Sequence, residues 1–235
     1  MNRDCITTLL NHRSIRKYKR EEVNEEDLKT ILEASRRAPT GWGLGWIDII
    51  VVKDKALKNK IAELVGDQKH VSEAPVLLVF VIDYARLMRV LEKVGAVPAK
   101  PNIGFLLAGF IDAGIVSSFA AIAAENLGYG ICYIAVYSAL CEIAELLDLP
   151  PGSLPVIGLT IGVPEENPGL RPRVSIRVLV DFNKYSNIEE KVDETLTQLR
   201  GYMEDTWKLV LSRNGVYESV GDKLLECLRK QGFNI

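Results

Sequence analysis

Residues 103–124 limit the possible folds of this chain more than any other stretch, because they are apolar over about six helical turns. Such a length can cross a membrane, yet Asp112 lies in its interior, and Glu125-Asn126 follow it without a basic anchor. A carboxylate at the centre of a bilayer costs about 2.5–3.5 kcal/mol on insertion scales. A helix that is apolar on every side is instead expected inside a large core or an obligate interface. The stretch therefore predicts a globular chain organised around one buried helix.

Composition narrows the classes of function. The 235 residues can bury a substantial core, and 29 basic against 31 acidic residues give a formal net charge of −2. This balance predicts no general attraction to nucleic acid or to a membrane, so that any anion site must be local. The cysteines at positions 5, 132, 141 and 227 form no CxxC pair and have no histidine at metal spacing. They predict reduced thiols in a cytoplasmic protein without a metal, with Cys132 and Cys141 as small buried side chains.

Periodicity predicts a mixture of helices and strands. Helices are expected over residues 4–11, 24–38, 55–65, 103–124, 141–147, 189–200 and 220–230, and strands over 47–52, 74–82, 131–136, 156–162 and 174–180. Asn24 before three acidic residues is a good N-cap, and Pro39 ends that helix. The continuous apolar run at 74–82 is typical of a strand that is covered on both faces. Residues 66–70 are expected to be a loop, and residues 86–103 an irregular excursion and a flexible lid.

A basic segment follows the first helix. Arg13 and Arg16 are three residues apart, with Ser14 between them, and can reach the same side of a bound molecule if helical spacing persists. The planar fork of arginine suits a phosphate or a pair of polarised carbonyls. The alternative is a solvated helix end, where cations favour the negative end of the dipole. These residues alone leave both interpretations open.

His12-Arg13-Ser14-Ile15-Arg16 followed by an aromatic residue resembles the opening motif of the nitroreductase and flavin reductase family, which are FMN-dependent oxidoreductases. Further segments follow in the family's order over essentially the whole chain: Ala38-Pro39-Thr40, Gly66 to His70, Leu127 to Gly130, Tyr133-Ile134, Leu154-Pro155, Asn167-Pro168, Arg171-Pro172-Arg173 and Asp205-Thr206-Trp207. The set is similar to the long-chain branch of oxygen-insensitive NADPH nitroreductases and NADPH flavin reductases. The resemblance implies an α+β, nitroreductase-like fold, with a central, mainly antiparallel sheet wrapped by helices in an intertwined homodimer. It also implies an FMN-binding core over residues 1–182 and a helical extension over 183–235 that packs on the core and on the partner subunit, within a single domain.

The same resemblance implies the cofactor-binding residues. Around the FMN phosphate it implies the side chains of Arg13, Arg171 and Arg173, with His12 and Ser14 beside them. Around the flavin ring it implies Arg16 at the N1–O2 edge, Gln68 at the edge where N3–H, O4 and N5 alternate, the loop residues Thr40, Gly41 and Trp42, in part from the partner subunit, and the strand end at Tyr133, Ile134, Ala135 and Val136. Two features depart from the family. Glycines stand in the loop where Ser, Asn or Gln is frequent, and Ala135 and Val136 replace glycines.

The chemistry implied needs few side chains. The chain has no GxSxG, HExxH or P-loop motif, and no GxGxxG in a strand-turn-helix setting. The resemblance implies a ping-pong reaction in which reduced nicotinamide passes a hydride to FMN, and a nitroaromatic, quinone or free flavin then takes the electrons. No catalytic acid or base is required, and Arg16 is expected to act as an electrostatic stabiliser of the reduced flavin. A non-catalytic flavin-binding or storage protein and a structural protein without cofactor remain alternatives.

Nicotinamide preference is predicted from the segment before Asp205-Thr206-Trp207. Members of the resembled branch prefer NADPH and carry an arginine-rich loop there, which can meet a 2′-phosphate. This chain has only Arg200 as a basic residue, and the acidic Glu204 follows it. We therefore expect NADH to be used comparably with NADPH. A substitute cation could come from Arg213, or from Arg86, Arg89 or Lys100 in the excursion.

Overall fold

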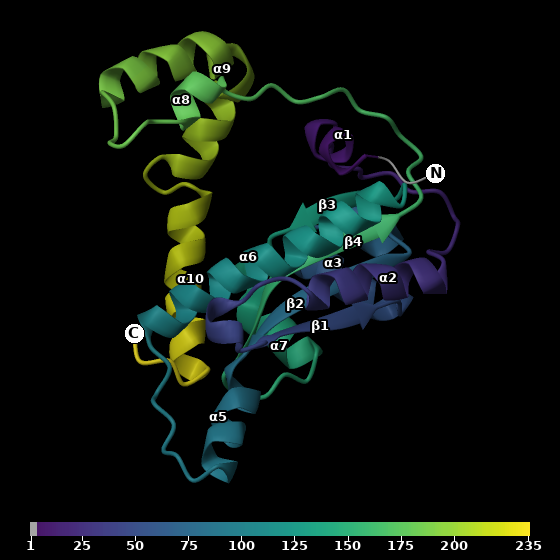
Figure 1. Cartoon of the computed structure of the whole chain (residues 1–235), viewed down its shortest axis with the longest axis vertical. Coiled ribbons are helices and arrows are strands. Elements are labelled where there is room, and N and C mark those ends of the chain that lie inside the picture. The colour runs from purple at the N-terminus through teal and green to yellow at the C-terminus, as the bar shows by residue number, and fades with distance from the viewer. Residues whose placement is uncertain (1–3) are drawn as a thin grey trace. The chain divides into compact units, whose positions relative to one another are not determined.

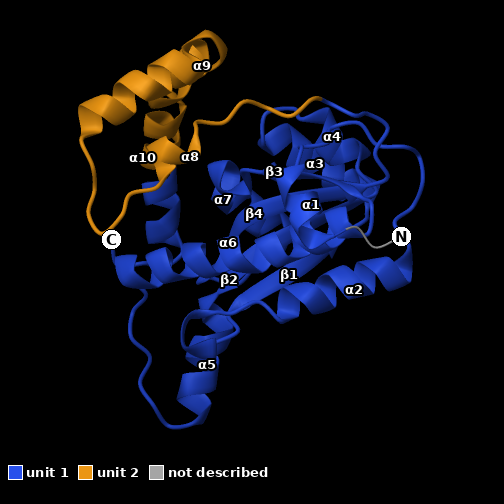
Figure 2. Ribbon diagram, turned by 45° about the horizontal axis from the view of Figure 1, so that its top comes forward, with its two compact units in different colours: residues 1–168, 224–235 blue, residues 169–223 orange. Residues whose placement is uncertain are grey.

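The computed structural model describes residues 4–235, and Figure 1 shows its helices and strands. The chain forms two compact units (Figure 2): the residues up to Pro168 together with Leu224–Ile235, and Gly169–Lys223. The first unit contains α1 (Cys5–Leu10), α2 (Glu25–Arg36), η1 (Gly41–Gly43), β1 (Ile47–Val52), α3 (Lys55–Leu64), α4 (Lys69–Glu73), β2 (Val76–Asp83), α5 (Tyr84–Lys93), α6 (Ile103–Asn126), β3 (Gly130–Ile134), η2 (Val136–Ala139), α7 (Leu140–Leu146) and β4 (Ser153–Gly162). The second contains α8 (Ile176–Leu179) and α9 (Ile188–Leu211), and α10 (Val216–Lys230) begins in the second unit and ends in the first.

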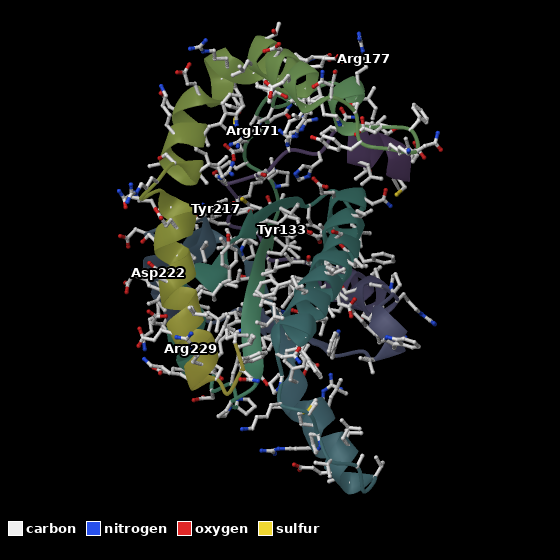
Figure 3. All side chains as sticks on the ribbon, turned by 90° about the vertical axis from the view of Figure 1, so that its left-hand side faces the viewer. Tyr133, Arg171, Arg177, Tyr217, Asp222 and Arg229 are labelled. Atoms are coloured by element: carbon white, nitrogen blue, oxygen red, sulfur yellow. A yellow bond between two sulfur atoms is a disulfide. The ribbon has the colours of Figure 1, made fainter. Side chains whose placement is uncertain are left out.

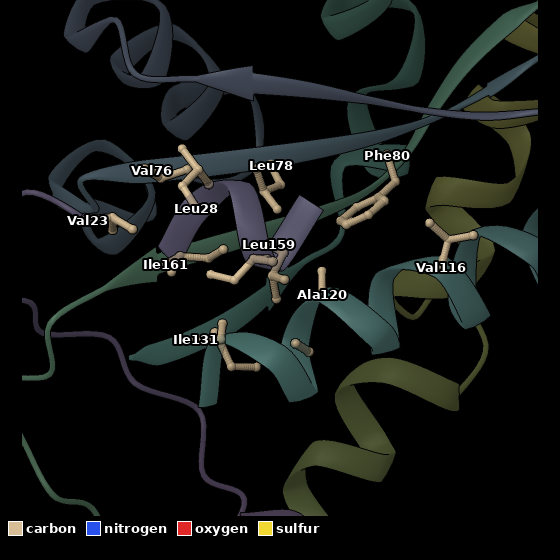
Figure 4. Packing of buried hydrophobic residues seen from close by; sticks show 13 residues of the cluster. Val23, Leu28, Val76, Leu78, Phe80, Val116, Ala120, Ile131, Leu159 and Ile161 are labelled. Atoms are coloured by element: carbon tan, nitrogen blue, oxygen red, sulfur yellow. The ribbon is translucent and has the colours of Figure 1, made fainter. Parts of the chain in front are cut away.

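The sheet of the first unit has the order β1-β2-β4-β3, and each neighbouring pair is antiparallel. The inner strand β2 is buried along its whole length, as its continuous apolar run predicts. Val76, Leu78 and Phe80 pack in the cluster that contains α2 and α6 (Figure 4), whereas Leu77 and Val79 pack with α3 and α7. Alternation with period two thus places helices on both faces of the sheet. The predicted α+β fold with an antiparallel sheet wrapped by helices is confirmed.

Helix α6 is the apolar helix that the sequence predicts. The Asn102 side chain accepts a hydrogen bond from the amide of Gly104 at 2.9 Å and caps the first turn. The helix ends before Gly128, whose φ of +96° is the left-handed conformation that favours glycine. A Cβ at Gly109 would lie 2.8 Å from atoms of Ile82 and Tyr84, so glycine allows the helix to approach the sheet closely.

Only one side of α6 is buried in the first unit. The other side carries Ile103, Leu107 and Ile111, which are 60%, 60% and 62% exposed. By length and composition alone α6 could span a membrane, and 44% of its most apolar window is buried inside the fold. The helix therefore packs as a core helix that leaves a second, apolar face uncovered within this chain.

Residues 174–180 do not form the strand that the sequence predicts. They contain the short helix α8, and the amide of Ser175 donates to Oε1 of Gln198 on α9 at 2.7 Å. The outer edge of β3, to which a further strand could have been added, is instead bonded by the N-terminal segment through Ile15. The mixed alternation of residues 174–180 also fits one helical turn, so the pattern alone did not decide between the two structures.

Cys141 and Cys227 form a disulfide between α7 and α10, with their Cα atoms 5.7 Å apart. The prediction of reduced thiols is wrong for this pair, as is the prediction that Cys141 serves only as a small buried side chain. The two positions are 86 residues apart in sequence, and no spacing motif connects them. Only the folded chain brings the two helices close enough for the bond.

The prediction of an irregular excursion over residues 86–103 is partly wrong. Its first part belongs to helix α5, whose N-cap Asp83 accepts a hydrogen bond from the amide of Arg86 at 3.1 Å. The helix ends before Gly95, and Asn102 then forms a parallel bridge with Asn234 near the carboxyl end of the chain.

Candidate functional site

The segment that carries the predicted basic residues lies along the edge of β3. The amide of Ile15 donates to the carbonyl of Ile131 at 2.8 Å, and Ile15 is buried. A Cβ at Gly130 would lie 2.7 Å from the Cβ of Ile15, so glycine is needed for this close approach. The buried hydroxyl of Tyr18 donates to the carbonyl of Ile15 at 2.7 Å, and burial raises the pKa of Tyr18. Residues 12–18, here called the basic edge, are therefore fixed at the edge of β3.

The polar side chains of the basic edge differ in whether they already have partners within the protein. His12 Nδ1 lies 2.9 Å from Oε1 of Glu125, and Arg13 donates from Nη1 to Oδ1 of Asn167. Ser14 is half-buried, and Arg16 is exposed. Within the described part of the chain the guanidinium of Arg16 forms no hydrogen bond or ion pair, and only its backbone amide is bonded. Arg16 therefore keeps all its side-chain donors available for a ligand.

The backbone of the basic edge is fixed by Glu166, which the sequence did not identify. Its Oε1 accepts hydrogen bonds from the amides of Arg16 at 2.5 Å and of Lys17 at 3.1 Å. A cavity of about 340 Å³ nearby is lined by Arg13 and by the carboxylates of Glu125 and Glu166, among other residues. The lining of this cavity therefore combines the positive charge of Arg13 with two carboxylates.

Gln68 and His70 lie at the beginning of α4, which starts inside the predicted loop 66–70. The half-buried Gln68 donates from Nε2 to the carbonyl of Val65 at 2.7 Å, so its side-chain oxygen is available as an acceptor. His70 is 7% exposed, and its Nε2 has no hydrogen-bond partner in the structure of residues 4–235. Burial, and then the positive charge of Arg16, lower the pKa of His70. The structure therefore brings the Gln68 segment and a neutral imidazole into the field of Arg16.

The end of β3 presents main chain more than side chains. Tyr133, labelled in Figure 3, is 42% exposed, and Ala135 is also exposed. Ile134 and Val136 are buried in the cluster between the sheet, α3 and α7. Any contact of these two residues with a ligand thus involves their backbone.

The loop of Thr40, Gly41 and Trp42 lies far from the basic edge within one chain. Gly41 is bonded to Asp112 on α6, whereas His12 is bonded to Glu125 on the same helix. At 1.5 Å per residue these two helix positions are about 20 Å apart. One chain therefore does not bring the loop and the basic edge together.

This loop is held by a buried carboxylate. Asp112 is 4% exposed, and it accepts hydrogen bonds from the amide of Gly41 at 3.0 and 2.9 Å and from Nε1 of Trp46 at 2.5 Å. Trp46 is buried edge-to-face against Tyr84, with ring centroids 5.0 Å apart, whereas Trp42 is fully exposed with φ of 55°. Sequence reasoning used Asp112 only to exclude a membrane helix. The signal for its role was present, because a carboxylate buried in an apolar helix must find donors.

The second unit carries the other two predicted phosphate ligands. Arg171, labelled in Figure 3, and Arg173 are exposed in the segment that precedes α8. Arg173 donates from Nη1 to the carbonyl of Pro172 at 3.2 Å. Neither arginine forms an ion pair with another residue of the described chain, so both charges are available to an anion.

The polar groups of the first unit match those needed to bind a planar, anionic cofactor such as FMN. Arg16 offers a complete guanidinium, Gln68 a carbonyl oxygen, and His70 a buried Nε2 without a partner. A buried polar nitrogen of this kind is usually satisfied, so it is consistent with a ligand that completes the site. Among the described residues, no group of three or more His, Cys, Asp or Glu side chains could hold a metal ion.

Comparison with known proteins agrees with this geometry. The chain is 34% identical to the oxygen-insensitive NADPH nitroreductase of Salmonella typhimurium, over 97% of both chains. It is also 34% identical to the FMN reductase [NAD(P)H] of Bacillus subtilis, over 99% of this chain and 98% of that protein.

Solved structures give the same result. The oxidoreductase YcnD of Bacillus subtilis superposes with a TM-score of 0.87 at 32% identity over 98% of both chains. The NADPH:FMN oxidoreductase of Vibrio harveyi in complex with NAD+ superposes with a TM-score of 0.81 at 28% identity, over 97% of this chain and 98% of that one. The sequence profile of the nitroreductase family matches residues 9–163, more than half of the chain. This chain therefore belongs to the nitroreductase family.

Proposed function

We propose that this protein is an FMN-dependent NAD(P)H oxidoreductase that reduces a small-molecule acceptor such as a nitroaromatic, a quinone or a free flavin. The observation that carries the proposal is the guanidinium of Arg16, which has no partner among the described residues and whose positive charge helps to lower the pKa of the buried His70. The names of the relatives, which include an NADPH nitroreductase and an FMN reductase, support the same reaction class. When bound, FMN supplies the hydride-accepting and hydride-donating chemistry in two half-reactions of a ping-pong cycle.

The protein residues have binding and electrostatic roles in this proposal. Arg16 faces the N1–O2 edge of the flavin, where reduction places negative charge, and a fixed cation stabilises the reduced form. Gln68 offers its side-chain oxygen to the ring N–H. Thr40, Gly41 and Trp42, and the strand end from Tyr133 through Ile134 and Ala135 to Val136, complete the ring site. No side chain acts as acid or base.

Arg13, Arg171 and Arg173 are proposed to hold the phosphate, with Ser14 and His12 beside it. The resemblance of these positions to the family's motifs supports this assignment. Bidentate guanidinium–phosphate bonds are strong and geometrically specific.

We further propose a homodimer. The exposed stripe of Ile103, Leu107 and Ile111 on α6 is too apolar to remain in water. Two copies of α6 packed against each other about a two-fold axis would cover this stripe, and the loop of Thr40, Gly41 and Trp42 is proposed to reach the flavin in part from the partner subunit. In this assembly residues 1–182 are the FMN-binding core, and residues 183–235 are a helical extension that packs on the core and on the partner subunit. A cytoplasmic location belongs to the same proposal.

The nucleotide preference is proposed to be weak. Arg200, the basic residue before Asp205-Thr206-Trp207, donates from Nε to Glu204 at 2.9 Å, and Lys208 donates to the same carboxylate at 2.6 Å. Arg86 is bonded to the carboxylates of Asp83 and Asp48. These cations are already paired, which supports comparable use of NADH and NADPH.

One experiment tests the function. The purified protein is expected to show flavin absorbance, which anaerobic NADPH or NADH should bleach and a nitroaromatic or quinone should then restore. Bound flavin that neither nucleotide bleaches would favour the storage-protein alternative, and a colourless protein without affinity for FMN would contradict the proposal. A kcat/KM ratio above about a hundredfold in favour of NADPH, or about 2.7 kcal/mol, would refute the weak preference.

A further inference from the structure

The buried carboxylate of Asp112 is the feature of this fold that the proposed chemistry does not use. It lies in an otherwise apolar helix and has no basic partner among residues 4–235. An ionised carboxylate without a cation is stable in such a place only when several donors point at it. Here the donors are the amide of Gly41 and the indole Nε1 of Trp46. Both belong to the loop that is proposed to meet the flavin.

The carboxylate holds the two ends of this loop. Gly41 is bonded at the first end and Trp46 at the second, and Trp46 is itself fixed in the core against Tyr84. A further hydrogen bond closes the loop, in which Thr40 Oγ1 accepts from the amide of Gly45 at 3.2 Å. The fully exposed Trp42 lies at the tip, with φ of 55°. A loop fixed at both ends loses little conformational entropy when a ligand meets it.

We propose that Asp112 is a positioning residue that fixes the 40–46 loop in its flavin-binding conformation before the cofactor arrives. The inference rests on the proposed function, because it requires that this loop contact FMN. Asp112 itself does not touch the cofactor. It acts through the amide of Gly41 and the indole of Trp46, and it sets where the backbone of Gly41 and the side chain of Trp42 are presented.

The decisive variant is Asp112→Asn, which keeps the shape and replaces one acceptor oxygen by a donor group. In either orientation of the new amide, this group would face the amide N–H of Gly41, so an attractive contact becomes a repulsive one. We expect the dissociation constant of FMN to rise about tenfold, measured by calorimetric titration of the apoprotein. Trp46→Phe removes the indole donor together with part of the buried ring, and it leaves the bond from Gly41 in place. Val116→Ala is the matched control, because Val116 is buried on the same helix and belongs to a different hydrophobic cluster from Trp46.

A spectroscopic signal separates positioning from general destabilisation. The chain has three tryptophans, at positions 42, 46 and 207, so the proton NMR spectrum shows three indole N–H resonances. The resonance that Trp46→Phe removes should lie downfield of the others in the wild type, since its N–H donates to a carboxylate. In Asp112→Asn it should move upfield, whereas Val116→Ala should leave it and FMN affinity unchanged while lowering the unfolding temperature.

The possible outcomes are distinct. Unchanged FMN affinity in Asp112→Asn, with wild-type protein that binds FMN, would overturn the positioning role and leave the proposed function intact. Equal loss of FMN affinity in Val116→Ala would also overturn it, because stability alone would then explain the effect. Wild-type protein that binds no FMN would instead overturn the proposed function, and the indole resonance would still report whether Asp112 fixes the loop.

Discussion

Helices α6 and α9 have the same length, 24 residues each, but very different surroundings. Helix α6 packs on the sheet of the first unit and buries residues along its length, including Leu106 and Val116. Helix α9 lies in the second unit, and none of its residues, all of which the structure describes, is buried. Yet each helix leaves an apolar stripe exposed at a spacing of four residues: Ile103, Leu107 and Ile111 on α6, and Ile188, Val192 and Leu196 on α9.

A helix can therefore be packed in the core of one chain and still expose apolar side chains to water. Helix α6 is stable in the first unit because one of its sides is already in a core. Helix α9 has charged residues over most of its surface and contributes little apolar burial in one chain. Both stripes are the kind of surface that a second copy of the chain would cover. The first unit is thus expected to supply the stability of the chain, and the second unit to depend on assembly.

The largest expected effect comes from the disulfide, because the loop that it closes contains the whole second unit. Replacing Cys141 and Cys227 together by serine should lower the free energy of unfolding by about 4–5 kcal/mol on the chain-entropy account, given the sequence separation of 86 residues. Urea unfolding of the oxidised protein and the variant measures this. The control is Cys5→Ser, at an exposed thiol on α1. A loss below about 1 kcal/mol would show that the second unit is not constrained through this bond.

A matched pair of leucines tests the contrast between the helices directly. Leu106→Ala on α6 should cost about 2–5 kcal/mol, since Leu106 is 4% exposed in a packed core. Leu196→Ala on α9 should change the stability of a single chain by at most about 0.5 kcal/mol, because Leu196 is 39% exposed. Unfolding at two protein concentrations provides the test. Equal losses for both variants at low concentration would contradict the contrast.

Arg173 tests the proposed phosphate site. Arg173→Ala should weaken FMN binding by about 1.5–3 kcal/mol, the usual value for a hydrogen bond to a charged group. Arg177→Ala serves as the control, because Arg177 is an exposed arginine on α8 in the same unit (Figure 3). Calorimetric titration of the apoprotein gives both affinities. If the two variants bind FMN equally well, Arg173 does not belong to the site.

Arg16 tests the proposed stabilisation of the reduced flavin, and the quantity measured is the midpoint potential of the flavin and not its affinity. Arg16→Ala should lower the midpoint potential of bound flavin, because a cation that stabilises the reduced, more negative form is removed. A loss of 1.4 kcal/mol in the reduced form corresponds to about 30 mV for a two-electron couple. Spectroelectrochemical titration measures it, with Lys17→Ala as the neighbouring control. A potential equal to or above that of the wild type would exclude the assignment.

The smallest expected effect is the dependence of stability on pH through His70. Burial lowers the pKa of His70 below its ordinary value of 6.5, so below that pH the unfolded chain binds more protons than the folded one. Stability should therefore be fully present above about pH 6.5 and decline as the pH falls through the folded pKa. Denaturation at pH 7.5 and 5.5 should show a flatter dependence in His70→Gln than in the wild type. An identical dependence in both proteins would exclude His70 as a source.

The sequence predicted the elements whose patterns are local. Strand β1 begins and ends at the predicted residues, and α2 is capped by Asn24 as expected. The prediction of a strand over residues 174–180 was wrong, because their pattern fits a strand as well as a helix and the neighbouring elements decided between the two. The disulfide was missed because two cysteines so far apart in sequence become partners only through the fold.

The site follows the same division. The basic edge could be recognised because its residues are consecutive, and the resemblance to the family assigned them to a cofactor. Glu166 accepts hydrogen bonds from the amides of Arg16 and Lys17, which lie about 150 residues earlier in the sequence. No local sequence pattern predicts such a bond. No sequence pattern indicates that Nε2 of His70 is buried without a partner, and this becomes visible only in three dimensions.

The bonds of the basic edge have a consequence for synthesis. Ile15 pairs with Ile131 and Arg13 with Asn167, so residues 13 and 15 wait for partners that are synthesised much later. At about 5–20 residues per second, the ribosome needs roughly 8–30 s to travel from the first of these positions to the last. Contacts of such long range also slow the folding of the finished chain. During this time Arg13 and Ile15 have no partners, and the bonds of the basic edge are complete only after the ribosome has passed the final strand of the sheet.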